Sequence, residues 1–212
     1  VIHTKHGRAV SSMGCAPWLR RYIYGLSNSI VVGSRETGEV FAARSGIDED
    51  SLTVVYNGID TDRYSPPAGG PAGARRRMTF MEGWGDGVVV FGAVSRLDPV
   101  KDHPTMLKAF AEVAQSDPRS RFMIVGEGPE REGIEKMVRE MGLGERVLMT
   151  GFTDDVPLYL SAMDMYMQPS LEEGLSRPLL EAASCGVSVV ATRVGGNPEV
   201  MEDGVTGRLV EA

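Results

Sequence analysis

The sequence has little cysteine, little histidine and no long hydrophobic run. Its two cysteines, Cys15 and Cys185, are too few for a disulfide framework, and its three histidines, His3, His6 and His103, are too scattered to suggest a metal site. No apolar run approaches the ~18 residues that a membrane-spanning helix needs. Acidic residues outnumber basic ones, 29 to 22. With a net charge of −7, the chain is not expected to bind a nucleic-acid backbone.

The length of 212 residues is enough for one large domain, or for one and a half. The chain begins at Val1, with no initiator methionine and no signal peptide, so we expect it to be a slice of a longer protein. Its basic run at residues 75–77 follows a stretch rich in Pro, Gly and Ala. We interpret this run as a solvated loop or helix start rather than a binding patch.

Strands and helices alternate along the chain. Predicted strands cover residues 29–32, 52–56, 88–92, 121–125, 147–150, 165–170, 187–191 and 208–210. Predicted helices cover residues 20–26, 34–45, 102–115, 130–141, 156–163 and 198–201, and another begins near Pro178. Continuously apolar strands separated by helices indicate an α/β fold with a parallel sheet covered on both faces. Residues 65–73, rich in Pro, Gly and Ala, are predicted to be an interdomain linker.

The most informative stretch, residues 172–182, reads as an acidic glycine turn between a strand and a helix. Gly174 lets the backbone approach a ligand, and the amides that open the helix carry partial positive charge, which favours an anion such as phosphate. Glu173 in the turn and Glu181 in the helix are eight residues apart and can converge on one ligand. The alternative is two surface glutamates with no shared role.

In parallel sheets, ligands bind beyond the carboxyl ends of the strands, so the loops there supply the candidate residues. The loop after residues 88–92 contains Arg96 and Lys101, which together can neutralise a diphosphate. The alternative for this pair is two exposed basic side chains that form salt bridges with Asp98 and Asp102.

Three more strand ends carry glycine turns: Gly126-Glu127-Gly128, Gly151-Phe152 and Gly195-Gly196. The first would let a flat base approach the backbone, although an ordinary strand-to-helix turn is the alternative. Five strand ends therefore each carry a glycine turn, a cation or an acid. This coincidence favours one shared ligand site.

Taken in order, these motifs resemble the retaining, nucleotide-sugar-dependent glycosyltransferases of the GT-B fold, the group 1, glycogen-synthase-like family. Residues 57–60, with the sequence NGID, resemble that family's link between two domains, and His6-Gly7 resembles its histidine-glycine motif. The resemblance runs over nearly all of the chain. Within the family it is greatest to sugar transferases of bacterial exopolysaccharide systems, where a Gly-Gly-Asn-Pro-Glu turn like that of residues 195–199 is similar.

The resemblance implies a Rossmann-like parallel sheet flanked by helices and a division into domains. Residues 1–64 would be the end of the N-terminal acceptor domain, residues 65–87 a linker and lead-in, and residues 88–212 the C-terminal donor-binding domain. The glycine-rich loop and most of the sheet of the N-terminal domain are expected to precede Val1. The closing C-terminal helix is expected to lie beyond Ala212.

The resemblance also implies roles for the polar residues. Arg96 and Lys101 match the pair that grips the donor diphosphate, and Glu173 matches the acid that holds the hydroxyls of the donor sugar. Glu181 matches the acid that accepts hydrogen bonds from the ribose, a role that suits an ionised carboxylate. His6 matches a cleft residue facing the donor sugar, with a structural loop histidine as the alternative.

Backbone positions are implied as well. The amides of Gly174 and Leu175 would meet the phosphate, and the segments around Glu127-Gly128 and Phe152 would line the base. The sequence departs from the family at residues 176 and 177, a serine and an arginine where small or apolar residues are usual, so an extra cation near the phosphates is expected. It also has Tyr56 where proline is common.

The implied activity is transfer of a hexose from a nucleoside-diphosphate sugar to an acceptor hydroxyl with the anomeric configuration kept, in polysaccharide or glycoconjugate synthesis. The donor is a substrate, and neither a cofactor nor a metal is expected. The implied acceptor is a carbohydrate or a lipid-linked molecule, and the implied location is cytoplasmic, with peripheral contact at the inner face of the membrane. Residues 1–212 alone are expected to bind nucleoside diphosphate weakly and without turnover. The alternatives are a GT-B nucleotide-sugar epimerase and a non-catalytic nucleotide-sugar-binding module.

Overall fold

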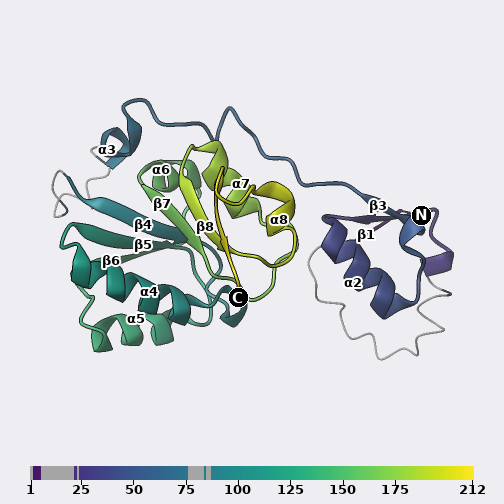
Figure 1. Ribbon diagram of the computed structural model, residues 1–212, viewed down its shortest axis with the longest axis horizontal. Coiled ribbons are helices and arrows are strands. Elements are labelled where there is room, and N and C mark those ends of the chain that lie inside the picture. Colours follow the sequence, from purple (N-terminus) through teal and green to yellow (C-terminus); the bar gives the residue numbers. More distant parts are fainter. Residues whose placement is uncertain (1, 6–21, 23, 76–83, 85–86) are drawn as a thin grey trace.

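The computed structural model describes residues 2–5, 22, 24–75, 84 and 87–212. Its strands form two separate sheets, one of three strands in the order β1-β2-β3 and one of six in the order β6-β5-β4-β7-β8-β9 (Figure 1). Every strand pair within these sheets is parallel. The α/β class predicted from the apolar strands is confirmed.

The smaller unit contains β1 (Ile2–Lys5), β2 (Ser29–Val32), β3 (Leu52–Val54) and helix α2 (Arg35–Ser45). Helix α2 begins and ends where the sequence predicts. The hydroxyl of Ser34 accepts the Thr37 amide at its start, and Gly46 closes its end with a φ of +67°. Strand β1 was not predicted, and the predicted strand 52–56 ends early, at Val54. Of the predicted helix at residues 20–26, Tyr22, Tyr24 and Gly25 are helical and several other positions lie outside the described residues.

The larger unit alternates strands and helices. Its strands are β4 (Val89–Val94), β5 (Ser120–Val125), β6 (Val147–Gly151), β7 (Met165–Gln168), β8 (Ser188–Thr192) and β9 (Gly207–Val210). Its main helices are α4 (His103–Ser116), α5 (Arg131–Glu140), α6 (Val156–Ser161), α7 (Arg177–Ser184) and α8 (Asn197–Val200). These bounds agree with the predictions to within about two residues.

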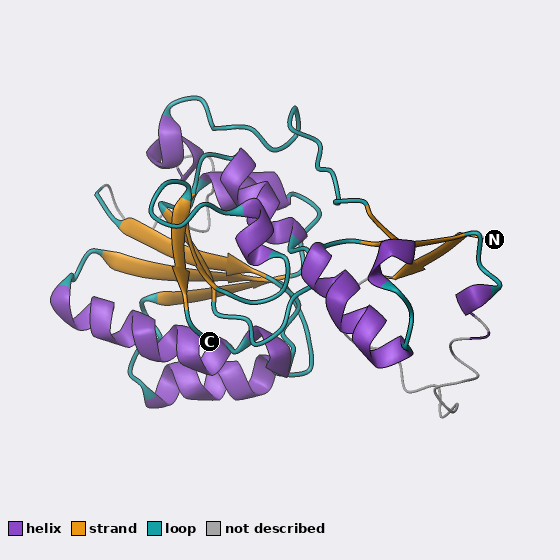
Figure 2. Cartoon of the chain, turned by 45° about the vertical axis from the view of Figure 1, so that its right-hand side comes forward, coloured by secondary structure: helices purple, strands orange, loops and turns teal. Residues whose placement is uncertain are grey.

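Each face of the larger sheet has its own hydrophobic core. Phe122 of β5 packs with Phe110 of α4 and Ile134 of α5 on one face. The neighbouring residue Met123 packs with Leu160 and Leu179, from α6 and α7, on the other face. Helices therefore cover both faces (Figures 1 and 2). This explains why the strands read as unbroken apolar runs rather than alternating patterns.

The segment between the two units is not wholly irregular. Helix α3 (Gly70–Arg75) lies partly inside residues 65–73, whose composition predicts a linker. The helix forms because Ala72 and Ala74 favour helical backbone and because Ala74 is buried in a core of the larger unit. Tyr64 is also buried in that core, and its carbonyl accepts a hydrogen bond from Ser184 of α7. The segment is therefore anchored to the larger unit.

The strand order places a crevice at the centre of the larger sheet. After β4 the chain proceeds to β5 and β6 on one side, whereas after β7 it proceeds to β8 and β9 on the other. The loops that follow β4 and β7 therefore diverge, and a ligand can sit between them beyond the carboxyl ends of these neighbouring strands.

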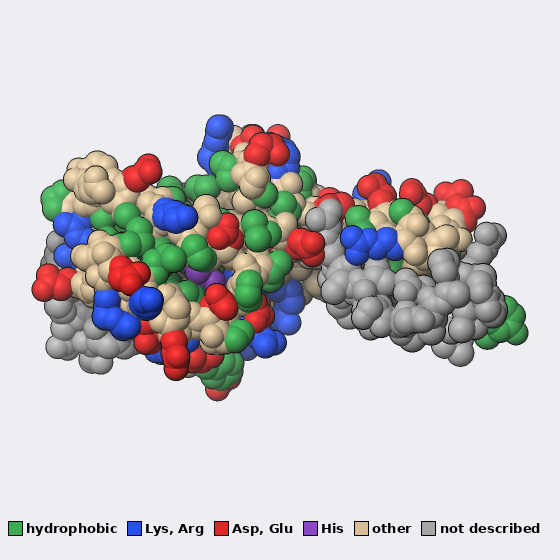
Figure 3. All heavy atoms as spheres, turned by 90° about the horizontal axis from the view of Figure 1, so that it is seen from below, with side chains coloured by type: hydrophobic (Ala, Val, Ile, Leu, Met, Phe, Trp, Pro, Cys, Tyr) green, Lys and Arg blue, Asp and Glu red, His purple; other side chains and the backbone are tan. Residues whose placement is uncertain are grey.

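The surface carries mixed charge. On the face shown in Figure 3, acidic and basic side chains are interspersed over the larger unit, with hydrophobic side chains between them. This face therefore does not present the continuous basic surface that a nucleic-acid backbone favours. Within the part of the chain that the structure describes, no helix combines the length and apolar character needed to cross a bilayer.

Candidate active site

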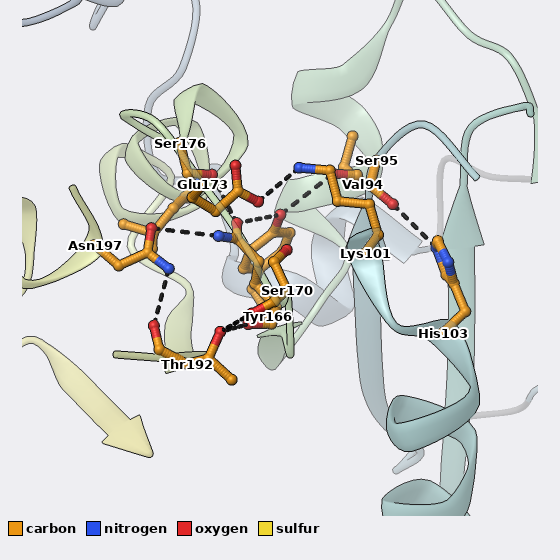
Figure 4. Close-up of polar contacts among 12 residues, drawn as sticks. Val94, Ser95, Lys101, His103, Tyr166, Ser170, Glu173, Ser176, Thr192 and Asn197 are labelled. Atoms are coloured by element: carbon orange, nitrogen blue, oxygen red, sulfur yellow. Dashed lines mark hydrogen bonds and ion pairs between the residues drawn. The ribbon is translucent and has the colours of Figure 1, made fainter. Parts of the chain in front are cut away.

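The loops after β4 and β7 bring Lys101 and Glu173 into direct contact. The Lys101 Nζ atom lies 2.6 Å from Glu173 Oε1 (Figure 4). The side chains are 21% and 9% exposed, so the pair is largely removed from water. The sequence predicted that these two residues, far apart along the chain, would meet at the rim of the sheet. The structure brings them together there.

A buried polar network supports the acidic turn from below (Figure 4). Ser176 Oγ donates to Gln168 Oε1 at 2.7 Å and also accepts the Leu179 amide, which makes Ser176 the N-cap of α7. Gln168 Nε2 lies 3.4 Å from Asn197 Oδ1, and the Asn197 amide donates to the carbonyl of Thr192 at 3.0 Å. Because these side chains are buried and bonded to one another, they fix the strand end and the turn above it.

Tyr166 lies at the centre of this network. Its hydroxyl donates to the Val94 carbonyl at 3.2 Å and is 3.3 Å from Gln168 Oε1. Burial raises the pKa of the phenol, and the negative charges of Glu173 and Glu181 raise it further. The charges of both predicted acids therefore disfavour ionisation of the same phenol.

Glu181 is buried on helix α7, with 6% of its surface exposed. Arg177, one turn earlier, places its Nη2 atom 3.4 Å from Glu181 Oε1. Burial raises the pKa of Tyr64, and the negative charge of Glu181 raises it further. The extra cation expected near the phosphates, Arg177, therefore pairs with the predicted ribose acid in this structure.

A cleft with a volume of about 400 Å³ opens beside the Lys101–Glu173 pair. It lies over the carboxyl ends of β4, β5 and β6. Its lining includes three residues that the sequence predicted for the site, namely Arg96, Glu127 and Phe152. Phe152 is 74% exposed, so one ring face is available to a flat group. Val94, Ser95 and Pro178 line both this cleft and the small space next to Lys101, so the two regions are neighbours.

The two predicted cations differ in their surroundings. Arg96 is 72% exposed and pairs with Asp98 at 3.0 Å, which is the salt bridge that the alternative interpretation proposed. Lys101 does not follow that alternative, because its partner is Glu173. Asp102 instead accepts the Thr105 amide as the N-cap of α4.

The two glycines of the Gly126-Glu127-Gly128 turn are explained by packing within the protein. A Cβ atom on Gly126 would lie 1.9 Å from the Ser95 carbonyl oxygen, and one on Gly128 would lie 2.5 Å from that of Leu97. Gly126 also has a φ of +139°, which side chains rarely allow. The backbone of the neighbouring loop therefore occupies the space on the Cβ side of both glycines, which excludes a side chain at either position. Glu127 pairs with Arg131 at the rim.

His103 is a site residue that the sequence did not single out. Its Nε2 atom lies 3.1 Å from Ser95 Oγ, and the side chain is only 2% exposed. Burial lowers the pKa of the imidazole to about 4, and the charge of Lys101 contributes to the lowering. His103 is therefore neutral near pH 7. The sequence feature that could have identified His103 as a site residue is its position, two residues after Lys101.

The remaining predictions concern His6 and metal binding. His6 lies outside the described residues. Among the residues that the structure does describe, no three His, Cys, Asp or Glu side chains are grouped so that they could hold a metal ion.

Gly174 and Leu175 lie in the turn directly before the N-cap of α7. Since Pro178 has no amide hydrogen and the Leu179 amide is capped by Ser176, an anion here would meet the amides from Gly174 to Arg177.

Two family models match the chain. The model for glycosyl transferases group 1 matches residues 75–212, and the model for glycosyltransferase family 4 matches residues 1–63.

Curated relatives match over the whole chain. A GDP-mannose-dependent alpha-(1-6)-phosphatidylinositol monomannoside mannosyltransferase of Mycolicibacterium smegmatis is 33% identical over 100% of this chain and 56% of its own length. The N-acetyl-alpha-D-glucosaminyl L-malate synthase of Bacillus anthracis is 31% identical over 100% of this chain and 54% of its own length. The chain therefore spans about half the length of these relatives.

A solved structure agrees in fold. The crystal structure of Anabaena HepE in complex with UDP-glucose superposes with a TM-score of 0.82 and 26% identity, covering 99% of this chain and 58% of the HepE chain.

Proposed function

Because the chain belongs to the glycosyl transferases group 1 family, we propose that it contains the donor site of an enzyme that moves a hexose from a nucleoside-diphosphate sugar to an acceptor hydroxyl, with retention of anomeric configuration. The observation that carries this proposal is the meeting of Lys101 and Glu173 beside a cleft at the point where the strand order reverses. A cation, an acid and a cleft then lie at the same edge of the sheet.

The chemical task is to stabilise negative charge on the departing diphosphate. In the proposal, Arg96, Lys101 and the amides of Gly174 and Leu175 meet that charge, because fixed positive groups are most effective where charge develops. We propose that bound diphosphate replaces Glu173 as the partner of Lys101. The Glu173 carboxylate is then free to accept hydrogen bonds from the hydroxyls of the sugar.

The nucleoside would occupy the cleft beside this centre. Glu181 would accept from the ribose hydroxyls, and the backbone around Glu127-Gly128 and the ring of Phe152 would line the base. The M. smegmatis relative is named for GDP-mannose, and HepE was crystallised with UDP-glucose. Both support a nucleotide-sugar donor for this chain, and they differ in base and sugar.

The proposal also covers the acceptor, the biosynthetic role and the cellular location. We propose a carbohydrate or lipid-linked acceptor in polysaccharide or glycoconjugate synthesis, supported by the phosphatidylinositol mannoside in the name of the M. smegmatis relative. A lipid acceptor is held at a membrane surface, so a cytoplasmic enzyme in contact with the inner face is part of the proposal. His6 is proposed to face the donor sugar, and no cofactor or bound metal is assigned to the reaction.

We propose three parts for the chain: residues 1–64 from an acceptor domain, residues 65–87 as linker and lead-in, and residues 88–212 as the donor domain. The two sheets and the anchored segment between them support this division.

A screen of UDP-, GDP- and ADP-sugars by thermal unfolding tests the donor class. A donor at 100 times its dissociation constant should stabilise the folded state by about 2.7 kcal/mol. The selected donor is then incubated with acceptor and the complete protein, and the product anomer is assigned by NMR. An inverted product contradicts retention. A sugar of altered stereochemistry without acceptor identifies an epimerase, and binding without hydrolysis or transfer identifies a non-catalytic binding module.

A further inference from the structure

The side chain of Glu199 joins the two units of the molecule. Glu199 lies on α8 in the larger unit, and its carboxylate accepts two backbone amides from α2 in the smaller unit. Oε2 accepts the Arg35 amide at 2.9 Å, and Oε1 accepts the Glu36 amide at 3.1 Å. These amides open helix α2, where amides lack partners within the helix and the helix dipole favours negative charge. The contact is therefore complementary in both hydrogen bonding and charge.

A third donor completes the contact. The hydroxyl of Tyr56, in the segment that leaves β3, donates to Glu199 Oε2 at 2.9 Å. The Glu199 carboxylate thus binds both the helix of the smaller unit and the chain that leads away from it.

The loop before Glu199 also touches the acidic turn. The Gly196 amide donates to the Gly174 carbonyl at 2.6 Å. Gly195 has a φ of +57°, and a Cβ atom there would lie 2.1 Å from the Glu173 carbonyl oxygen. A Cβ atom on Gly196 would lie 2.9 Å from Cβ of Ser34, the N-cap of α2. One short loop therefore contacts both Glu173-Gly174 and the start of α2.

We propose that Glu199 is a positioning residue. By binding α2, it holds the smaller unit against the loop that contacts Glu173-Gly174, and so it sets the distance between that unit and Glu173. This role concerns domain docking and needs no ligand. Its consequence for catalysis rests on the proposed function, since a transferase must align an acceptor held by one domain with a donor held by the other.

The docking claim is tested by a distance between two spin labels. Labels are placed at the exposed positions Ala43 on α2 and Glu132 on α5, as Ala43→Cys and Glu132→Cys, in a complete protein with Cys15→Ser. The native Cys185 is buried and stays. We expect one narrow distance distribution, which Glu199→Ala broadens toward longer distances. Glu202→Ala is the matched control, because Glu202 is an exposed glutamate three residues along the chain.

Two milder variants distinguish loss of the Glu199 contacts from a general loss of folding. Tyr56→Phe removes one of the three bonds, and Glu199→Gln keeps the volume and one oxygen acceptor while losing the charge. Both should shift the distribution less than Glu199→Ala does. An unchanged distribution of label distances in all three variants would overturn the proposed docking role of Glu199. If Glu199→Ala fails to fold, the other two variants still decide the matter.

Kinetics test the coupling to the site. In Glu199→Ala we expect kcat to fall about tenfold, the scale of one or two net hydrogen bonds, while nucleoside-diphosphate affinity stays within about twofold. Glu199→Gln should recover part of kcat. Equal losses in nucleotide affinity and kcat would contradict a positioning role and indicate damage to the donor domain. The label distances are measured without substrate, so they stand even if the proposed donor proves wrong.

Discussion

Lys101 holds Glu173 in this structure and would hold a phosphate in the proposed complex. Both are anionic oxygens, so the lysine can exchange one for the other without leaving its position between β4 and α4. The exchange leaves the Glu173 carboxylate without its cation, and sugar hydroxyls are suitable replacement donors. In the proposed complex, the Lys101–Glu173 ion pair therefore gives way to a contact between Lys101 and phosphate.

Removing either cation should slow transfer. We expect Arg96→Ala and Lys101→Met, assayed in the complete protein with saturating acceptor, to lower kcat by about 100-fold, the scale for losing one charge-stabilising donor. Lys108→Ala, an exposed lysine on α4, is the control and should change little. Turnover near that of the wild type in both site variants would refute their assignment to the diphosphate.

Lys101 is also expected to stabilise the folded state, and this effect can be measured separately from transfer. Because the Lys101–Glu173 pair is largely buried, Lys101→Met should leave an unpaired carboxylate and lower the free energy of unfolding by about 1–3 kcal/mol. Urea unfolding measures this loss. Adding Glu173→Gln should restore part of the stability without restoring transfer. Equal stability of the single and double variants would mean that the pair is not coupled.

His103 should make stability depend on pH. The folded-state pKa of about 4 lies below the ordinary value of 6.5, so between these values the unfolded chain binds the proton and the folded chain does not. Stability is then full above pH 6.5 and is lost as pH falls toward 4, by up to about 3 kcal/mol. His103→Gln keeps a polar group near Ser95 and does not titrate. Urea unfolding between pH 4 and pH 7 should show a flatter profile for this variant, and identical profiles would contradict the assignment.

At the scale of elements, the loops rather than the strands make the site. The turn at Gly195 is the clearest case, because it needs both a positive φ and the absence of a side chain next to Glu173. Gly195→Ala should therefore lower stability by roughly 1–3 kcal/mol and move the acidic turn.

Gly133→Ala is the control for this substitution. Gly133 lies inside α5, and no atom beyond its chain neighbours and the backbone of its own helix lies within 4 Å of its Cβ position, so alanine there should stabilise by up to about 1 kcal/mol. Thermal unfolding should show a lower midpoint than the wild type for Gly195→Ala and a higher one for Gly133→Ala. A Gly195→Ala protein as stable as the wild type would show that the turn can relax.

Elements could be predicted from sequence wherever the local signal and the packing agree. Ser34 and Gly46 delimit α2 because a cap at each end is a local requirement. The buried strands of the larger sheet were predicted because burial on both faces leaves continuous apolar runs. The meeting of Lys101 and Glu173 could be predicted because the carboxyl ends of parallel strands lie at one edge.

What could not be predicted depends on contacts between distant segments. Helix α3 lies in a stretch with linker composition and is held by the burial of Ala74. The packing of Gly128 against Leu97 and the burial of His103 follow from the neighbouring loops rather than from their own sequence. The bonds of Glu199 to α2 join residues more than 160 positions apart, and no local pattern announces them.

At the scale of the whole molecule, two units are held together near the proposed donor site. The chain spans about half the length of its curated relatives. We predict that residues 1–212 alone bind nucleoside diphosphate weakly and transfer no sugar, since acceptor binding is proposed to need more of the protein. Calorimetry and a transfer assay on the same preparation check this. Robust transfer by this chain alone would contradict the prediction.

The most direct test of the donor site is a crystal structure of the protein with the nucleoside diphosphate that the thermal screen selects. The account predicts a diphosphate within hydrogen-bonding distance of Arg96, Lys101 and the amides of Gly174 and Leu175, with the ribose on Glu181. It also predicts that Lys101 has left Glu173. A nucleotide bound elsewhere on the molecule, with the Lys101–Glu173 pair intact, would contradict it.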